Sequence, residues 1–583
     1  MSEHDPTPLR EARYGPVVDV ALLLVIGVSL FLVLTFGYGR DQGIYAVVAR
    51  TVLDGGMPYR DAWDFKPPGI YVLYAAARAR LGSEQLGIRI VEVLGLALSI
   101  RGLMVLARRF WGEPRIGLLA GALATLVHAQ LDFWHTAQPE SFGGMLTVWG
   151  LVVGTAPASG WRRGSRYVLA GVLFGCAGLL KPPLAGAGAV LALVAAVERW
   201  RQSAPTEAVA RARGDGGQTT SRRSEGGERS GRAVLLGALM PVGAVLVGGI
   251  LPFVACLVWF GAKGALGDLY DTLFVFTPHY TALGWEGRHI LGLYYQALAQ
   301  WFVSYSSLNA GGLLLLVAAG SSAWRRRGLP LLLGIVAIQL LGVALQGKFF
   351  PYHYGAVWPV ASLVVALGWW HWWSRAVRRG PLVAAGFALL LFVVGLMRTA
   401  TKDLADSVWS RTADRFSLFA SGLPERDLDA VDALASVADV NAAGNRAVAA
   451  MLRAHVSAEQ PVFIWGFEPV IYDMADRQLA SHYLYNVPQR VDWVTDSSRR
   501  TLMRELRQRP PAAIVVGHHD LLPMVTGDYL DSAHVLEGFS ELQSMIELEY
   551  QYFARVEDFD VYCARQAPLE HGADAAAGSQ EQL

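Results

Sequence analysis

The chain alternates long apolar runs with short polar segments, and the runs have the lengths that membrane-spanning helices need. A helix requires about 20 apolar residues to cross the hydrocarbon core, and somewhat fewer where the bilayer is thinned. The pattern predicts about eleven transmembrane helices, near residues 17–36, 86–107, 116–130, 142–156, 167–180, 183–198, 233–260, 309–323, 329–346, 354–373 and 381–397. The predicted fold class is therefore a polytopic α-helical membrane protein.

Composition supports this class and excludes others. Of the 583 residues, 53% are hydrophobic and only 17% are charged, which is unusual for a soluble chain of this length. A net charge of +1 argues against a nucleic-acid-binding protein, which needs a basic surface to neutralise phosphates. The three cysteines, two of them inside apolar runs, provide neither a disulfide framework nor a metal cluster.

Basic residues predict the orientation, because Lys and Arg collect in cytoplasmic loops. The arginine groups that fall on one side of the predicted membrane are Arg10 and Arg13, Arg108 to Arg115, Arg162 to Arg166, Arg325 to Arg327, and Arg375 to Arg379. This predicts a cytoplasmic N-terminus and an extracytoplasmic C-terminus. The first apolar run lacks a small-residue cleavage site after it, so we expect a retained anchor.

The same pattern predicts the domain organisation. Residues 1–397 form the expected transmembrane catalytic domain, with exterior loops at 37–85 and 261–308. A Gly-, Ser- and Arg-rich stretch at 201–232 predicts a disordered cytoplasmic linker. From 398 to 571 the composition is that of a soluble domain, and 572–583 is an expected disordered tail. The elements expected in this α/β domain are strands beginning at Pro461 and Pro511, a helix over 499–509 and strands within 550–565.

Asp41 follows the first apolar run and precedes Ile44, Val47, Val48 and Val52, which repeat at helical spacing. An amphipathic helix along the membrane interface is therefore expected here. Its carboxylate is placed to act as a general base on an acceptor hydroxyl. Asp is also a favoured helix N-cap, and spacing alone favours neither interpretation.

Lys66 precedes two prolines, which stiffen the backbone and hold the ammonium group on a rigid turn. A fixed cation of this kind would stabilise a phosphate leaving group; an isolated interfacial lysine more often extends toward lipid headgroups. The neighbouring Arg60, Asp61 and Asp64 make a functional site more probable. Asp64 is either a further catalytic acid or an ion-pair partner of Lys66. A second Lys-Pro-Pro, at Lys181, is interpreted as a turn with a headgroup-facing lysine.

The acid after the first span, followed by Tyr45-Ala46 and by Phe65-Lys-Pro-Pro-Gly-Ile-Tyr71, resembles the GT-C superfamily of membrane glycosyltransferases. The bacterial branch of glycosyltransferase family 39, with its protein O-mannosyltransferases and lipid A aminoarabinose transferases, is the most similar. The resemblance implies that Asp41 is the catalytic acid and that Lys66 contacts the phosphate of a polyprenyl-phosphate sugar donor. Many members have two adjacent acids where this chain has Asp41-Gln42.

Two further segments fit the resemblance. Glu140 follows a proline before the fourth span and is a second candidate acid, although it is also placed to cap that helix. The segment from Lys348 to Tyr354 resembles the family's basic, aromatic and histidine element. The remaining candidates are Lys348, His353 and Arg89 for donor phosphate, and Tyr45, Tyr71, Tyr352 and Tyr354 for sugar or lipid. Arg89 and Glu92 are spaced to neutralise each other.

The resemblance implies an inverting transferase of the hexosyl or pentosyl class in the bacterial plasma (inner) membrane. Its partners would be the bilayer, the polyprenyl-phosphate sugar donor and an extracytoplasmic acceptor, which is a protein, a lipid or a cell-envelope glycan. No cofactor is demanded by the sequence; a divalent metal is possible, and the His518-His519-Asp520 segment favours a solvated turn over a zinc site. The alternatives are a lipid or small-molecule transporter or flippase, and an inactive scaffold.

Overall fold

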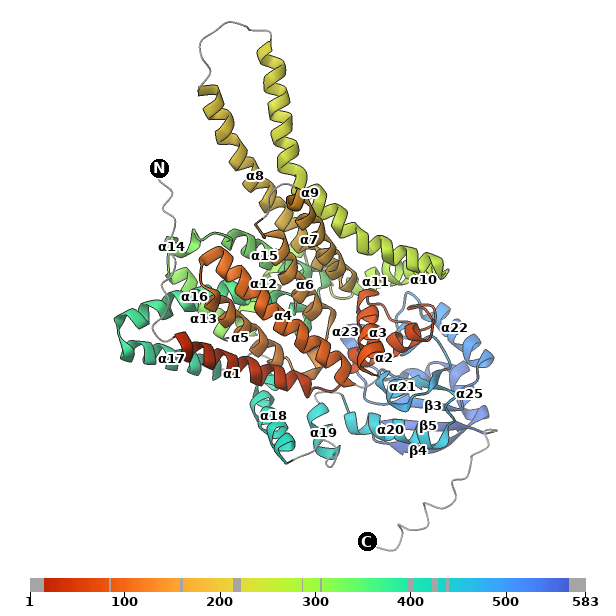
Figure 1. Ribbon diagram of the computed structural model, residues 1–583. Helices are drawn as coiled ribbons and strands as arrows, with labels where there is room; N and C mark the ends of the chain where they lie inside the picture. The colour runs from red at the N-terminus through yellow and green to blue at the C-terminus, as the bar shows by residue number, and fades with distance from the viewer. Residues whose placement is uncertain are drawn as a thin grey trace. The chain divides into compact units, whose positions relative to one another are not determined.

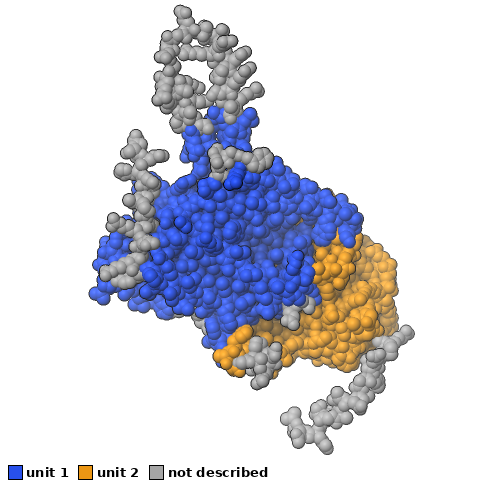
Figure 2. Space-filling model, in the orientation of Figure 1, with its two compact units in different colours: residues 1–37, 66–267, 284–417 blue, residues 38–65, 268–283, 418–583 orange. Residues whose placement is uncertain are grey.

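The computed structural model describes residues 15–82, 85–157, 161–212, 222–285, 287–304, 307–396, 402–421, 428–436 and 440–565. These residues form two compact units, coloured separately in Figure 2. Unit 1 comprises Met1–Gly37, Lys66–Gly267 and Gly284–Ser417, and unit 2 comprises Tyr38–Phe65, Asp268–Leu283 and Leu418–Leu583. The predicted tail at 572–583 lies outside the described residues.

Unit 1 consists of helices, and each of the eleven predicted spans overlaps one of them (Figure 1). The longer helices are α1 (Gly15–Leu34), α3 (Gly69–Leu81), α4 (Gln85–Trp111), α5 (Pro114–Gln130), α6 (Pro139–Gly154), α7 (Trp161–Leu180), α8 (Gly186–Ala212), α9 (Arg222–Ala262), α12 (Ile290–Ser304), α13 (Ser307–Ala318), α15 (Leu329–Gln346), α16 (Val357–Arg379), α17 (Pro381–Leu396) and α18 (Lys402–Ala420). Short turns of helix connect them: η1 (Phe133–His135), η2 (Pro182–Ala185), α14 (Ser321–Trp324) and η4 (Pro351–Tyr354).

Five helices of the described residues are long and apolar enough to cross a membrane, or up to six if the bent pair Ile290–Phe302 and Ser307–Ala318 is one span. The five are within α1, α4, η2 with α8, α9 and α15. Others are shorter, as in α6 with 16 residues. The larger number of spans and their orientation therefore stay predictions.

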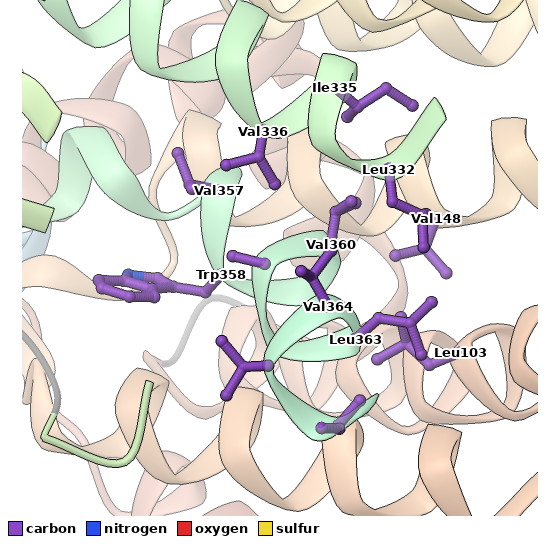
Figure 3. Packing of buried hydrophobic residues seen from close by; sticks show 14 of the residues in the cluster. Leu103, Val148, Leu332, Ile335, Val336, Val357, Trp358, Val360, Leu363 and Val364 are labelled. Carbon is purple, nitrogen blue, oxygen red and sulfur yellow. The ribbon is translucent and has the colours of Figure 1, made fainter. Parts of the chain in front are cut away.

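Helix α16 lies at the centre of a large apolar core, whose side chains surround it on several sides (Figure 3). Val360, Leu363 and Val364 of α16 are almost completely buried, and Leu103 of α4 and Val148 of α6 belong to the same cluster. A helix that is buried all round must be apolar all round. This explains why the sequence of α16 reads as a membrane span although it packs against protein on many sides.

The stretch at 201–232 differs from the predicted disordered linker. Its first part continues α8 as far as Ala212, and its last part begins α9 at Arg222. Residues 213–221 lie outside the described residues. Alanine, arginine and glutamate favour helix even where no apolar face is available for packing, which composition-based reasoning about a core does not capture.

Unit 2 contains a five-stranded sheet with the order β2-β1-β3-β5-β4. Strand β1 (Pro461–Trp465) pairs in parallel with β2 (Gln478–Leu479) and β3 (Ala513–Gly517), and β5 (Phe559–Ala564) pairs antiparallel with β3 and with β4 (Tyr550–Val556). The helices of the unit are α2 (Arg40–Leu53), α11 (Thr277–Ala282), α19 (Leu428–Ala435), α20 (Ala442–His455), α21 (Val470–Ala475), α22 (Thr495–Gln508), α23 (Pro523–Thr526), α24 (Ser532–Glu537) and α25 (Ser540–Glu549), with α10 (Leu266–Tyr270) at its boundary, the π-helical turn η3 (Asp271–Phe276) and the short turn η5 (Val487–Gln489). Strand β1 begins at Pro461 as predicted, β3 begins two residues after the predicted Pro511, and α22 begins four residues before the predicted helix at 499–509.

Residues 38–65 of the first exterior segment belong to unit 2, so the compact units divide the chain differently from the expected boundary at residue 397. The predicted helix after Asp41 is present as α2, and its residues Ile44, Val47 and Val48 are fully buried. At Gly43 an added Cβ would approach Val470 of α21 within 2.8 Å. The absence of a side chain at Gly43 therefore lets α2 pack closely on α21.

Aromatic rings connect two segments of unit 2, Tyr38–Phe65 and Asp268–Leu283. The ring of Phe276 lies 4.8 Å from that of Trp63, and the ring of Tyr280 lies 4.3 Å from that of Phe65. The backbone N–H of Trp63 also donates to the backbone carbonyl of His482 at 2.7 Å. Three segments far apart in the sequence therefore share one packed body.

Candidate functional site

Four basic side chains act on the imidazole of His353 in unit 1. The charges that act on the imidazole come from Lys181, Lys66, Lys348 and His135. Burial lowers the pKa of His353 well below its usual range, and these cations lower it further. His353 and Lys348 are buried, with 5% and 6% of their surface exposed. We call these five residues the basic cluster; it joins three of the residues that sequence reasoning selected separately.

Two identical tripeptides bring two of the lysines together. Lys66-Pro-Pro leads into α3, and Lys181-Pro-Pro leads from α7 into η2. A Cβ added at Gly69, the first residue of α3, would approach the carbonyl of Leu179 within 2.7 Å. The start of α3 therefore touches the end of α7, and the two turns are neighbours although 115 positions separate Lys66 and Lys181.

Glu140 provides the carboxylate of this region. It is fully buried in the first turn of α6 and forms an ion pair with Lys181. Its second oxygen, Oε2, has no hydrogen-bond partner in the described structure. The predicted N-cap role is wrong, because Gln138 is the N-cap residue and Glu140 lies inside the helix. The pairing also replaces the headgroup-facing interpretation of Lys181, whose side chain is 14% exposed.

Aromatic rings surround the basic cluster. The ring of Tyr352 stacks on His135 at 5.9 Å and meets His353 edge-on at 4.6 Å. The Lys181 ammonium lies 5.8 Å from the centre of the Tyr352 ring, within the range of a cation–π contact. Tyr352 therefore stays a candidate contact for sugar or lipid, while Tyr354 donates its hydroxyl to Gln300 Oε1 at 3.1 Å and belongs to the apolar core.

The other predicted tyrosine contacts are buried. Tyr71 donates its hydroxyl to the carbonyl of Lys66 at 3.1 Å and so stiffens the turn that presents this lysine. Tyr45 is fully buried in α2. The positions of both residues favour support of the site over direct contact with a ligand.

Arg89, a predicted phosphate contact, is completely buried and engaged on every nitrogen. Its guanidinium donates to Glu92, to Thr136 and to the carbonyls of Phe36, Gly37 and Phe133. The expected pairing with Glu92 is confirmed at 2.8 Å. These contacts connect the end of α1 to η1, so the geometry favours a structural role for Arg89.

Two predicted acids of unit 2 lie near one tyrosine. Tyr485 donates its hydroxyl to Asp64 Oδ1 at 2.6 Å, and both residues are fully buried. Burial raises the pKa of Tyr485 well above its usual range, and the charges of Asp64 and Asp41 raise it further. Asp41, Asp64 and Tyr485, which we call the acidic group, are therefore near one another.

Asp41 is the second residue of α2, whose N-cap is Gly39. The capping alternative for Asp41 is therefore wrong, and Gln42 satisfies the cap instead by accepting from the Gly39 N–H at 3.0 Å. Beside it, Arg40 forms a buried ion pair with Glu468 at 2.7 Å. Glu468 also accepts from Asn445 Nδ2 at 2.9 Å. No motif could have revealed this pair, since its members are 428 positions apart.

The described residues contain no group of three or more His, Cys, Asp or Glu that could hold a metal ion. In the segment considered for zinc, His518 pairs with Asp560 at 2.8 Å and His519 with Asp558 at 2.9 Å.

One protein-family model matches part of the chain. Residues 65–210 match the family described as dolichyl-phosphate-mannose-protein mannosyltransferase. This confirms the resemblance to the GT-C membrane glycosyltransferases. The matched segment contains Lys66, Glu140 and Lys181, and it is about a quarter of the chain. No curated protein matches.

Among solved structures, the chain is similar to ArnT from Cupriavidus metallidurans bound to undecaprenyl phosphate, with 15% identity, a TM-score of 0.48 and coverage of 94% of this chain and 98% of that one. The apo state of the same protein is 15% identical, with a TM-score of 0.47 and coverage of 94% of this chain and 97% of that one. The chain is also similar to the Archaeoglobus fulgidus oligosaccharyltransferase in complex with Zn and sulfate. The identity is 16%, the TM-score is 0.43, and the coverage is 93% of this chain and 73% of that one.

Proposed function

We propose that the protein is an integral membrane glycosyltransferase that moves a sugar, with inversion, from a polyprenyl-phosphate donor to an extracytoplasmic acceptor. The observation that carries this proposal is the basic cluster, which gathers Lys66, Lys181 and Lys348 around His353 in unit 1. Its lysines come from segments that include two of the motifs on which the family resemblance rests. The site faces the extracytoplasmic side in this proposal, and the inner membrane of a bacterium is the expected location.

The basic cluster is suited to a phosphate leaving group. Breaking the bond between the sugar and the phosphate oxygen leaves negative charge on that oxygen, and preorganised cations stabilise such charge most where water is excluded. Three lysines and two histidines surround the region, against the carboxylate of Glu140. The depressed pKa of His353 leaves its imidazole neutral near pH 7, as a hydrogen-bonding group.

The acidic group supplies the base in this proposal. Asp41 removes the proton of the acceptor hydroxyl while the oxygen attacks the anomeric carbon from the face opposite the phosphate. The new carbon–oxygen bond forms as the sugar–phosphate bond breaks, so the configuration inverts. Asp64 is held by Tyr485 and is separated from Lys66 along the chain by Phe65 alone. Glu140 is the alternative acid, since its Oε2 has no hydrogen-bond partner.

The test is sugar transfer from a panel of labelled polyprenyl-phosphate sugars by the full-length protein in membranes. Lys66→Met should lower the rate by about 10²-fold or more, the size of effect seen when one preorganised group is removed from a site of developing charge. Asp41→Asn should abolish transfer. The matched control is Lys263→Met, which removes an exposed lysine outside the basic cluster.

Three outcomes would contradict parts of this proposal. Transfer that survives Asp41→Asn would move the base to Asp64 or Glu140. Equal rates for Lys66→Met and Lys263→Met would remove the basic cluster from catalysis. The absence of transfer from every donor, with donor lipid crossing the membrane instead, would favour the flippase.

A further inference from the structure

Unit 2 contains an open cavity of about 740 Å³ beside the edge strand β2. Its walls come from the second half of α2 and the loop after it, from the segment around β2 and from the end of α22. The lining residues include Arg50, Arg60, Asp61, His482, Glu505 and Arg509. This volume lies within the range of about 300–1,000 Å³ that small-molecule sites occupy.

The lining is polar and its charges are balanced, which restricts the ligand. Arg60 pairs with Asp61 at 2.7 Å, and Arg50 pairs with Asp476 at 3.4 Å. A phosphate would have to compete with these carboxylates for the guanidinium groups. Most small-molecule sites are lined mainly by hydrophobic and aromatic side chains, whereas the residues that line this one are mainly charged or polar.

The polar groups of the cavity are held in place before any ligand arrives. Glu505 accepts from Ser481 Oγ at 2.7 Å and faces His482 Nδ1 at 2.7 Å. Arg509 donates to the side chain of Gln478, the first residue of β2. Carboxylates that accept and guanidinium groups that donate thus line the same space. Hydroxyl groups, which both donate and accept, complement this arrangement.

We infer that this cavity binds a neutral oligosaccharide, as a subsite for the sugar chain of the acceptor. The assignment of this ligand to the acceptor rests on the proposed function. The assignment of the ligand as a neutral saccharide rests on the cavity alone. An extended peptide is the less suitable occupant, because β2 has two residues and strand addition needs a longer edge of main-chain hydrogen bonds.

The position of the cavity on α2 gives the subsite its place in the reaction. Asp41 and Arg50 are nine positions apart on this helix, which corresponds to about 14 Å along its axis. A sugar ring in the cavity therefore does not occupy the position of the reacting hydroxyl. The cavity binds a part of the acceptor remote from the bond that forms, and such remote binding energy serves to orient the reacting group.

The test is calorimetric binding of neutral tetrasaccharides of glucose, mannose and arabinose to the purified full-length protein in detergent. Ala458→Trp places a large ring in the cavity from an exposed position. It should weaken binding at least tenfold. Ala454→Trp is the matched control, since Ala454 is exposed on α20 and does not line the cavity. Arg509→Ala, which removes one lining donor, should weaken binding several-fold.

The inference is overturned if none of these saccharides binds at millimolar concentration, or if Ala458→Trp and Ala454→Trp bind equally well. Preferential binding of a charged peptide over every saccharide would overturn the assignment of ligand class. Because binding is measured without a donor, its failure differs from failure of the proposed function. If the protein transfers no sugar but binds a saccharide in the cavity, the saccharide site is supported and the proposed glycosyltransferase function is contradicted.

Discussion

The hydroxyl of Tyr485 donates a hydrogen bond of 2.6 Å to Asp64, although 421 positions separate the two residues. Tyr485 lies in the C-terminal part of unit 2, and Asp64 lies in the segment that was expected to be a loop of the membrane domain. The C-terminal part of unit 2 thus contacts a candidate catalytic acid directly.

Removing this hydroxyl should impair transfer without unfolding the protein. Tyr485→Phe leaves a buried carboxylate without one of its donors, which costs about 1.5–3 kcal/mol for a hydrogen bond to a charged group. If Asp64 takes part in the reaction, kcat should fall by roughly 10–100-fold, with little change in KM for the acceptor. Tyr552→Phe, which alters a largely exposed tyrosine on β4, is the control. Equal kcat for the two variants would limit Tyr485 to a structural role.

Removal of one partner of the buried Arg40–Glu468 ion pair should destabilise unit 2 strongly. Both side chains are almost fully buried, and removing one partner of a buried pair costs about 3–5 kcal/mol because the other charge stays uncompensated. Glu468→Gln should therefore lower the thermal unfolding temperature of the purified protein by several degrees. Glu505→Gln, at a more exposed ion pair, should lower it less. A larger decrease in unfolding temperature for Glu505→Gln than for Glu468→Gln would contradict this prediction.

Glu140 and Lys181 should behave as a coupled pair. Lys181→Met alone strands a buried carboxylate and should destabilise the protein by about 3 kcal/mol. Adding Glu140→Gln removes that charge, so the double variant should recover part of the lost stability. Transfer should not recover with it, because the donor phosphate has lost one of its cations. Unfolding and transfer are measured on the same four proteins, and additive effects on stability would contradict the coupling.

His353 should make stability depend on pH. Its folded-state pKa is depressed, so below the ordinary value of about 6.5 the unfolded chain binds the proton more readily than the folded protein does. Stability contributed by the neutral imidazole is therefore complete above pH 6.5 and declines as the pH falls, by at most about 1.4 kcal/mol per unit.

His353→Gln should reduce this decline between pH 6.5 and 5, as measured by thermal unfolding in detergent. The wild type and the variant would then have similar unfolding temperatures at pH 7.5, and the unfolding temperature of the wild type would fall more steeply as the pH decreases. Parallel curves for the two proteins would contradict the assignment.

The sequence predicted helices and strands well because periodicity and apolar runs are local properties. Each predicted span overlaps a helix, and the strand beginning at Pro461 is present as β1. The positions of Lys66 and Glu140 were also recognisable, because local motifs mark them.

What local patterns could not supply were the partners. The sequence predicts Glu140 as a candidate acid, with helix capping as the alternative, whereas its ion pair with Lys181 depends on two chain segments meeting in space. The repeated Lys-Pro-Pro was the available signal for Lys181. Glu468 and Tyr485 had no such signal, since a single carboxylate or phenol in a soluble-looking segment indicates nothing until its contact is known.

The way in which unit 2 is assembled from distant segments has a consequence for biosynthesis. Arg40 and Asp64 leave the ribosome more than 400 residues before Glu468 and Tyr485. At about 5–20 residues per second, these side chains wait on the order of 20–80 s for their partners. During that interval the nascent segment is exposed to proteases and quality-control factors, and a prematurely terminated chain would carry the family motif without the contacts that hold it.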